Sequence, residues 1–214
     1  PSTLASSILL IYIARYLAKI KDDVVDFSKT IVPLWIPVFI VLALIFPANF
    51  STAAILFVLV LIICFLGGYP IKHLLLIIST GVFVLTIFIL TIKAYPDIMP
   101  NRVDTWTSRV ENFINSENTE SNYQIEKAKI AIATGGIKGL GPGKSIQKNF
   151  LPQSSSDFIY AIIIEEFGLI GGLFLVILYL WFLFRIVIIS NKSESIFGSL
   201  LAVSMGLPIV FQAF

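Results

Sequence analysis

Residues 151–164 read LPQSSSDFIYAIII, and within them the chain passes from a polar segment into a long apolar run. The polar segment covers residues 93–157 and has apolar runs on both sides. Asp157 is the last residue before the second of these runs. Loops held by a rigid scaffold often carry function, and an ionisable group where the chain enters a membrane is a functional candidate. We therefore expect the chemistry to lie in this segment.

The composition places the chain among membrane proteins. Hydrophobic residues make up 57% of the 214 residues, charged residues make up 13%, and the mean hydropathy is +0.93. The apolar residues form runs near the ~20 residues that cross a bilayer as a helix. We predict an all-α fold, a polytopic bundle of transmembrane helices with a large extracytoplasmic loop. The net charge of +2 is too small to indicate nucleic-acid binding.

Six apolar runs divide the chain into three parts. Residues 1–92 hold four runs, residues 93–157 form the loop, and residues 158–214 hold two more. The runs cover residues 4–18, 31–47, 50–68, 72–92, 158–184 and 195–214. Only Ala48 and Asn49 separate the second run from the third. A single helix over both would be about 57 Å long, so we predict a tight hairpin with Asn49 as a turn residue.

Basic residues at the ends of these runs indicate the orientation. If each run crosses the membrane once, one side collects Arg15, Lys19, Lys21, Lys29, Lys72, Arg185 and Lys192. The turn at residues 47–50, on the opposite side, has no basic residue. By the positive-inside rule the basic side is cytoplasmic, which places residues 93–157 outside.

Two short helices are predicted within the loop. Apolar residues between positions 103 and 113 recur at helical spacing, as in a helix that lies in the membrane interface. Residues 124–134 predict a second helix, which Gly135 and Gly136 would end as a C-cap.

The chain has a single cysteine, Cys64, and a single histidine, His73. A His/Cys metal site is therefore excluded, and no cofactor is certain, although carboxylates could hold a divalent cation. The chain begins at Pro1 without a methionine and ends at Phe214 inside an apolar run. We interpret it as a fragment of a longer protein.

A glycine-rich basic stretch precedes the junction at Asp157, where the polar segment meets the apolar run. Residues 135–145 read GGIKGLGPGKS, which lacks the spacing of a nucleotide-binding P-loop. Backbone amides beside lysines can form an anion-binding concavity, which would suit a lipid headgroup or a lipid pyrophosphate. The alternative is a flexible turn with solvated lysines. The predicted substrate-binding residues are Lys138, Gly139, Gly141, Lys144, Lys148 and Ser156.

Three carboxylates, Asp157, Glu165 and Glu166, lie at or shortly after this junction, and each has two interpretations. The dipole of a helix stabilises a charged Asp157 in its first turn, which suits a general base but also an ordinary helix cap, with Ser155 or Ser156 as N-cap. Glu165 and Glu166 lie one to two turns deeper. At that depth, ionisable groups mark a functional site or a structural pair with a partner that the sequence does not reveal.

Several motifs resemble the SEDS proteins, the FtsW/RodA/SpoVE group of bacterial cell-wall polymerases. PSTLA at residues 1–5 looks like the family's Q-P-S-E-L-A, and PANFSTA at residues 47–53 is similar to Q-P-D-[FL]-G-T-A, with Asn49 in place of Asp. The most specific match covers residues 124–172 and includes GGIKGLG, SDFIYA and EEFGLIG.

This resemblance implies a larger transmembrane bundle, of which the chain lacks N-terminal and C-terminal spans. It implies a peptidoglycan glycosyltransferase that polymerises lipid II at the outer face of the bacterial inner membrane, with a class B penicillin-binding protein transpeptidase as partner. Asp157 matches the family's essential aspartate, which would deprotonate the acceptor sugar hydroxyl while undecaprenyl pyrophosphate leaves. The glycine-rich loop would then bind the pyrophosphate of the polyprenyl-linked glycan.

Two other functions stay open at this point. A transporter, or flippase, of lipid-linked precursors would use ionisable groups near the midplane, which favours Glu165 and Glu166. A non-catalytic scaffold would only position a transpeptidase. A polymerase instead needs its carboxylate at the outer surface, which favours Asp157. Roles in cell division, in the elongation that sets cell shape, and in sporulation all fit these motifs.

Overall fold

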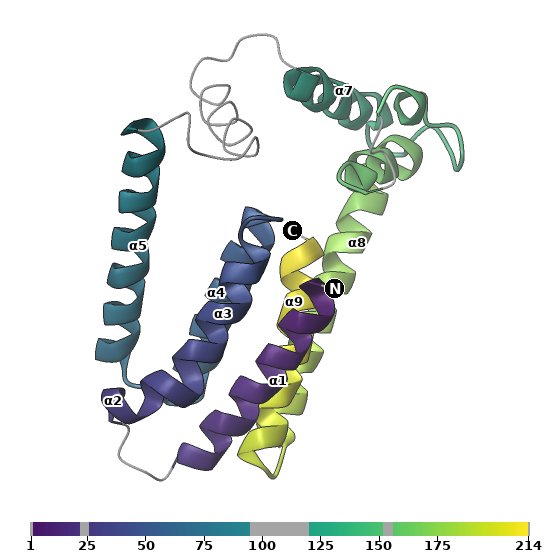
Figure 1. The fold of residues 1–214 in the computed structure, drawn as a ribbon. Coiled ribbons are helices and arrows are strands. Elements are labelled where there is room, and N and C mark those ends of the chain that lie inside the picture. The colour runs from purple at the N-terminus through teal and green to yellow at the C-terminus, as the bar shows by residue number, and fades with distance from the viewer. Residues whose placement is uncertain (1, 22–25, 95–119, 152–155, 214) are drawn as a thin grey trace. The chain divides into compact units, whose positions relative to one another are not determined.

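The computed structural model describes residues 2–21, 26–94, 120–151 and 156–213. Every regular element within these residues is a helix (Figure 1). The described residues fall into two compact units. The first draws on residues 1–99 and 182–214, and the second on residues 100–181.

All six predicted apolar runs form helices. Among the described residues, four stretches are long and apolar enough to cross a bilayer: α1 (Ser2–Ile20), the continuous helix Phe27–Ile45, α8 (Ile159–Lys192) and α9 (Ile196–Ala213). Helix α4 (Phe50–Leu66) is shorter, and α5 (Ile71–Ala94) is apolar from Ile71 to Val84. The prediction of an all-α, polytopic membrane protein is confirmed.

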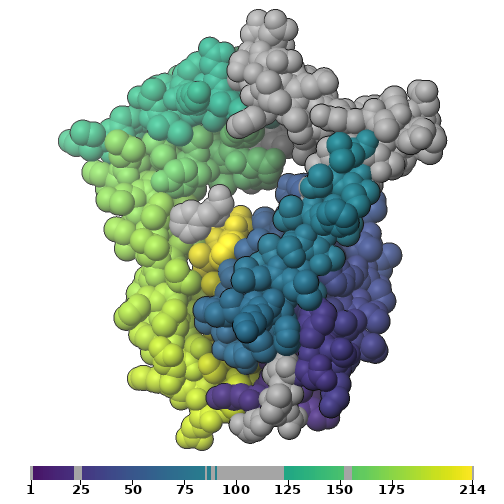
Figure 2. All heavy atoms as spheres, turned by 90° about the vertical axis from the view of Figure 1, so that its left-hand side faces the viewer, coloured from purple at the N-terminus to yellow at the C-terminus, as the bar shows by residue number. Residues whose placement is uncertain are grey.

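The core of the first unit forms where α1, α3 (Ile36–Ile45), α4 and α9 pack against one another. Helix α1 lies along α9 (Figure 1). Buried side chains such as Leu10, Ile13 and Val60 fill the interior. Figure 2 shows α5 on the outside, where its exposed side chains include Val82 and Phe83. An apolar outer surface is expected of a helix that faces lipid.

The continuous helix Phe27–Ile45 contains a π-helical turn. Its parts are α2 (Phe27–Thr30), η1 (Ile31–Trp35) and α3. Pro33 lacks a backbone amide and its ring crowds the preceding turn, and a π-helical turn accommodates this interruption. Trp35 is 1% exposed and donates from Nε1 to the Tyr69 hydroxyl at 3.1 Å, and that hydroxyl also bonds Thr30 at 2.7 Å. This buried network holds the turn against the core.

A tight turn joins α3 to α4, as predicted. The amides of Ala48 and Asn49 donate to the Ile45 carbonyl at 3.0 and 2.9 Å. The Asn49 side chain accepts a hydrogen bond from the Thr52 amide at 3.2 Å. Asparagine is among the best N-cap residues. Asn49 is therefore the N-cap of α4 as well as a turn residue.

The second unit contains α7 (Glu120–Gly135), η3 (Gln147–Asn149) and the first part of α8. The helix predicted over residues 124–134 is confirmed and begins four residues earlier. Gly136, with φ at +53°, takes the left-handed conformation of a glycine that ends a helix. The interfacial helix predicted over residues 103–113 lies outside the described residues.

Candidate active site

Helix α8 is interrupted at Gly168, a break that the sequence analysis did not predict. Gly168 has φ 71° and ψ −174°, a conformation that is essentially restricted to glycine. In an uninterrupted α-helix, the amides of Leu169 and Ile170 would donate to the carbonyls of Glu165 and Glu166. The break separates these four groups, and each needs another partner.

The glycine-rich loop after α7 supplies those partners. The amides of Leu140 and Gly141 donate to the carbonyls of Glu165 and Glu166, both at 2.9 Å. In return, the Leu169 amide donates to Gly136 O at 2.9 Å, and the Ile170 amide donates to Ile137 O at 3.4 Å. The loop thus inserts into the break in α8 and replaces the two missing helical hydrogen bonds with four others.

Glycines at the contact allow the two backbones to approach. A Cβ atom on Gly135 would lie 2.1 Å from the Ile164 carbonyl oxygen, and one on Gly139 would lie 2.2 Å from that of Glu166. A Cβ atom on Gly168 would lie 2.1 Å from the Ile137 carbonyl oxygen. No side chain fits at these distances. Gly135, Gly139 and Gly168 therefore serve the docking of the loop, a role that the sequence analysis did not assign to Gly139.

Glu165 holds the end of the same loop through its carboxylate. Its side chain is 0% exposed. The Ser145 hydroxyl donates to Oε2, the Ile146 amide donates to Oε1 at 3.1 Å, and the Gln147 amide lies 3.3 Å from both oxygens. These donors begin the turn η3, so the carboxylate caps that turn. The partner that the sequence did not reveal is a set of backbone and hydroxyl donors.

Three predicted substrate-binding lysines project from the docked loop. Lys138, Lys144 and Lys148 are all exposed. The amides of Gly139, Leu140 and Gly141 donate to carbonyls of the protein itself. Lys127, by contrast, lies 5.2 Å from the ring centroids of both Tyr123 and Phe150. An anion on this loop would accordingly meet lysine ammonium groups rather than the bonded amides.

Asp157 lies in the turn 156–158, directly before α8, and is exposed. The Ile159 amide lies 3.5 Å from the Ser156 carbonyl oxygen, and no described residue donates a hydrogen bond to the Asp157 carboxylate. Glu166 is half-buried, and its carbonyl is one of the two that the loop binds. The described residues contain no group of three His, Cys, Asp or Glu side chains placed to hold a metal ion.

The FtsW/RodA/SpoVE family, described as cell cycle proteins, matches residues 1–214. The chain belongs to this family. The probable peptidoglycan glycosyltransferase FtsW of Nitrosococcus halophilus is 33% identical over 218 residues, which cover 100% of the chain and 54% of that protein. The proteins of the same name from Bacillus subtilis and Saccharophagus degradans are 32% and 29% identical, with the same coverage. The chain thus spans about half the length of these relatives.

For this FtsW/RodA/SpoVE family member, sequence reasoning singled out the segment around Asp157 and the glycine-rich loop but missed the residues that hold this loop in place. Ser145, Ile146 and Gln147 hold Glu165, and Gly168 opens the helix. The one available signal was EEFG at residues 165–168, where two carboxylates and a glycine occur together inside an apolar run. Glycine in a helix interior costs about 1 kcal/mol relative to alanine, so its presence there indicates a structural demand.

The docking of the loop predicts different effects for two matched glycines. Gly139 and Gly143 have φ values of +78° and +73°, so alanine adds a similar strain of ~1–2 kcal/mol at either position. At Gly143, an added Cβ atom meets nothing within 4 Å, whereas at Gly139 it collides with Glu166 O. We expect Gly139→Ala to accelerate amide hydrogen exchange across residues 136–150 at least about tenfold more than Gly143→Ala. Equal exchange in the two variants would contradict the docked loop.

The capping role of Glu165 predicts a contrast with its neighbour. Glu165→Gln keeps the size of the side chain but turns one accepting oxygen into a donor that faces other donors, which costs ~1–3 kcal/mol. We expect faster hydrogen exchange at the amides of Ile146 and Gln147. Glu166→Gln is the control, because no described residue hydrogen-bonds the Glu166 side chain. Equal exchange rates at these two amides in both variants would contradict the assignment of the Glu165 carboxylate as the cap of η3.

Proposed function

We propose that the full-length protein is a peptidoglycan glycosyltransferase that polymerises lipid II, with Asp157 as the general base. The observation that carries this proposal is an exposed carboxylate at the start of α8 together with an exposed lysine group on the loop that α8 holds. Eight residues separate Asp157 from Glu165, which corresponds to about 12 Å along a helix axis. A disaccharide with its pyrophosphate is large enough to span such a distance.

The proposed reaction transfers one proton and exchanges one bond at the anomeric carbon. Asp157 removes the proton from the acceptor sugar hydroxyl of lipid II, and the resulting oxygen attacks the anomeric carbon of the growing glycan. A new carbon–oxygen bond forms as the bond to undecaprenyl pyrophosphate breaks. The leaving pyrophosphate carries the developing negative charge, which Lys138, Lys144 and Lys148 stabilise.

The docked loop supports this assignment, because electrostatic catalysis needs charges that are already in place before the reaction. Its backbone is held at both ends, by the exchange with α8 near Gly139 and by the Glu165 carboxylate near Gln147. The backbone that carries the lysines is therefore held in place before the substrate binds. The sequence also suggested Gly139, Gly141 and Ser156 for substrate binding. In the proposal, Gly139 and Gly141 contribute through the shape of this loop, and Ser156 contributes through the turn directly before α8.

The membrane setting completes the proposal. We place the catalytic loop at the outer face of the bacterial inner membrane, following the distribution of basic residues, so that polyprenyl tails lie along the apolar helices. A class B penicillin-binding protein would then cross-link the glycan that this protein makes. Relatives named as probable peptidoglycan glycosyltransferases support the substrate class.

The surroundings of Glu165 disfavour the transporter alternative. A transporter would present an ionisable group to a pathway near the midplane of the membrane. Glu165 instead is fully buried, and its two oxygens are used by Ser145, Ile146 and Gln147. A carboxylate with this set of bonds stabilises the loop and is not accessible to a passing headgroup.

Replacing the proposed base should separate the polymerase from the transporter. We expect Asp157→Asn to lower the rate of lipid II polymerisation by the full-length protein and its transpeptidase partner about 10²- to 10⁴-fold. Glu126→Gln, an exposed carboxylate on α7, is the control. A parallel measurement follows translocation of labelled lipid II across vesicle membranes. Polymerisation at the wild-type rate in Asp157→Asn would remove this residue from the mechanism, and lost translocation would favour the transporter.

The lysines predict a second kinetic effect. We expect Lys144→Ala and Lys148→Ala each to lower kcat/KM for lipid II about 10- to 100-fold, because each loses a charge-assisted contact with the pyrophosphate. Lys129→Ala, an exposed lysine on α7, should leave the rate unchanged. The measurement is polymer yield against lipid II concentration. Equal losses in all three variants would indicate a general effect of charge rather than a pyrophosphate site.

A further inference from the structure

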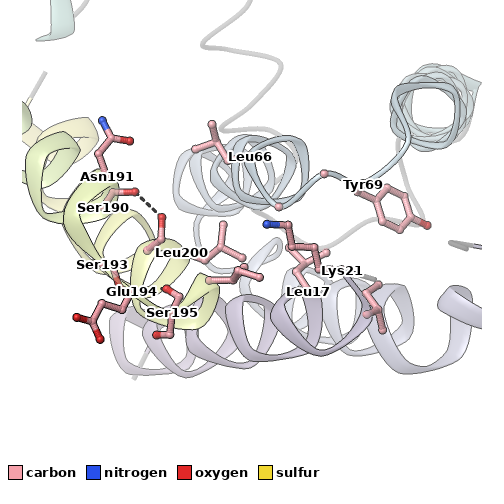
Figure 3. A pocket seen from close by; sticks show the side chains of 15 residues that line it. Leu17, Lys21, Leu66, Tyr69, Ser190, Asn191, Ser193, Glu194, Ser195 and Leu200 are labelled. Carbon is pink, nitrogen blue, oxygen red and sulfur yellow. Dashed lines mark hydrogen bonds between the residues drawn. The ribbon is translucent and has the colours of Figure 1, made fainter. Parts of the chain in front are cut away.

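The first unit contains a pocket where several of its helices end (Figure 3). It has a volume of about 520 Å³ and lies between the C-terminal end of α1, the turn after α4, and the connection from α8 to α9. Its size falls in the range of ordinary small-molecule sites. Because α1, α8 and α9 have the length and composition of membrane spans, this end of the first unit lies near a membrane–water interface.

The lining of this pocket is amphipathic. Its apolar part includes Leu17 and Leu200, which are 1% and 4% exposed, together with Leu66. Its polar part comes mainly from the α8–α9 connection, with Ser193 and Ser195. A ligand that fits both parts has a polar head and an apolar remainder.

The charge directed into the pocket is positive. Figure 3 shows the Lys21 ammonium group pointing toward the space between α4 and the α8–α9 connection, and the Glu194 carboxylate pointing away from it. The Ser195 hydroxyl accepts a hydrogen bond from the Gly198 amide at 3.0 Å, which leaves its own proton to donate. The pocket thus offers an ammonium group and a hydroxyl donor, which suit a phosphate oxygen.

We propose that this pocket binds the phosphate headgroup of an anionic phospholipid from the adjoining membrane leaflet. Lys21 and Ser195 contact the phosphate, and the leucines contact the glycerol and the first methylene groups of the acyl chains. Basic pockets between transmembrane helices are established sites for acidic lipid headgroups. This proposal is independent of the proposed glycosyltransferase function, because every residue that lines the pocket belongs to the first unit, whereas Asp157 and the loop lysines belong to the second.

The test compares lysines at the same end of the first unit. Native mass spectrometry of the full-length protein in detergent would count bound phosphatidylglycerol for wild type, Lys21→Ala, Lys21→Arg and Lys192→Ala. Lys192 is exposed at the end of α8 and does not line the pocket. We expect Lys21→Ala to reduce the bound fraction about fivefold, while Lys21→Arg and Lys192→Ala retain it. Phosphatidylcholine, which carries no net charge, should bind wild type more weakly.

Three results would overturn the proposal. Equal retention of phosphatidylglycerol by Lys21→Ala and Lys192→Ala would show that headgroups bind by general attraction to basic residues. Equal binding of phosphatidylglycerol and phosphatidylcholine by wild type would show that the pocket does not select an anion. Displacement of the lipid by millimolar inorganic phosphate alone would show a site for free phosphate. Thermal unfolding of each variant at the wild-type temperature confirms that Lys21→Ala is folded.

Discussion

The exchange of backbone hydrogen bonds at Gly168 is the interaction on which the candidate site depends. A break in a membrane helix exposes amides and carbonyls that find no partner in lipid, at a cost of several kcal/mol for each group. The loop at residues 136–141 satisfies four such groups, and its own amides and carbonyls are satisfied in return. Each of the two segments therefore supplies the hydrogen-bond partners that the other lacks.

This constraint separates structural residues from those available to a substrate. The buried groups, namely the glycines of the contact and the Glu165 carboxylate, are fully used in holding the loop. The exposed groups, Asp157 and the loop lysines, have no such structural partner among the described residues. A carboxylate in the apolar part of a helix is therefore not a sign of catalysis by itself. Its hydrogen-bond partners decide between the two roles.

The elements that local patterns specify were predictable. Runs of about 20 apolar residues located the membrane helices, and Pro47 to Asn49 indicated the turn between two of them. Glycine after a helical pattern located the end of α7 at Gly135 and Gly136. The break at Gly168 was not predictable in this way, because residues 159–192 have the length and mean hydropathy of a membrane span, and the partners of the broken helix lie in a loop about 30 residues earlier in the chain.

The sequence by itself determined the membrane location, the helical class, the family, and the segment in which Asp157 and the lysines occur. Each of these depends on composition, on short-range spacing, or on a motif that can be compared directly. Only the tertiary structure decided that Glu165 caps η3, that Gly139 and Gly168 permit backbone contact, and that Lys21 points into a pocket. The physical reason is that a hydrogen-bond partner or a close contact distant in the chain leaves no local pattern around the residue that needs it.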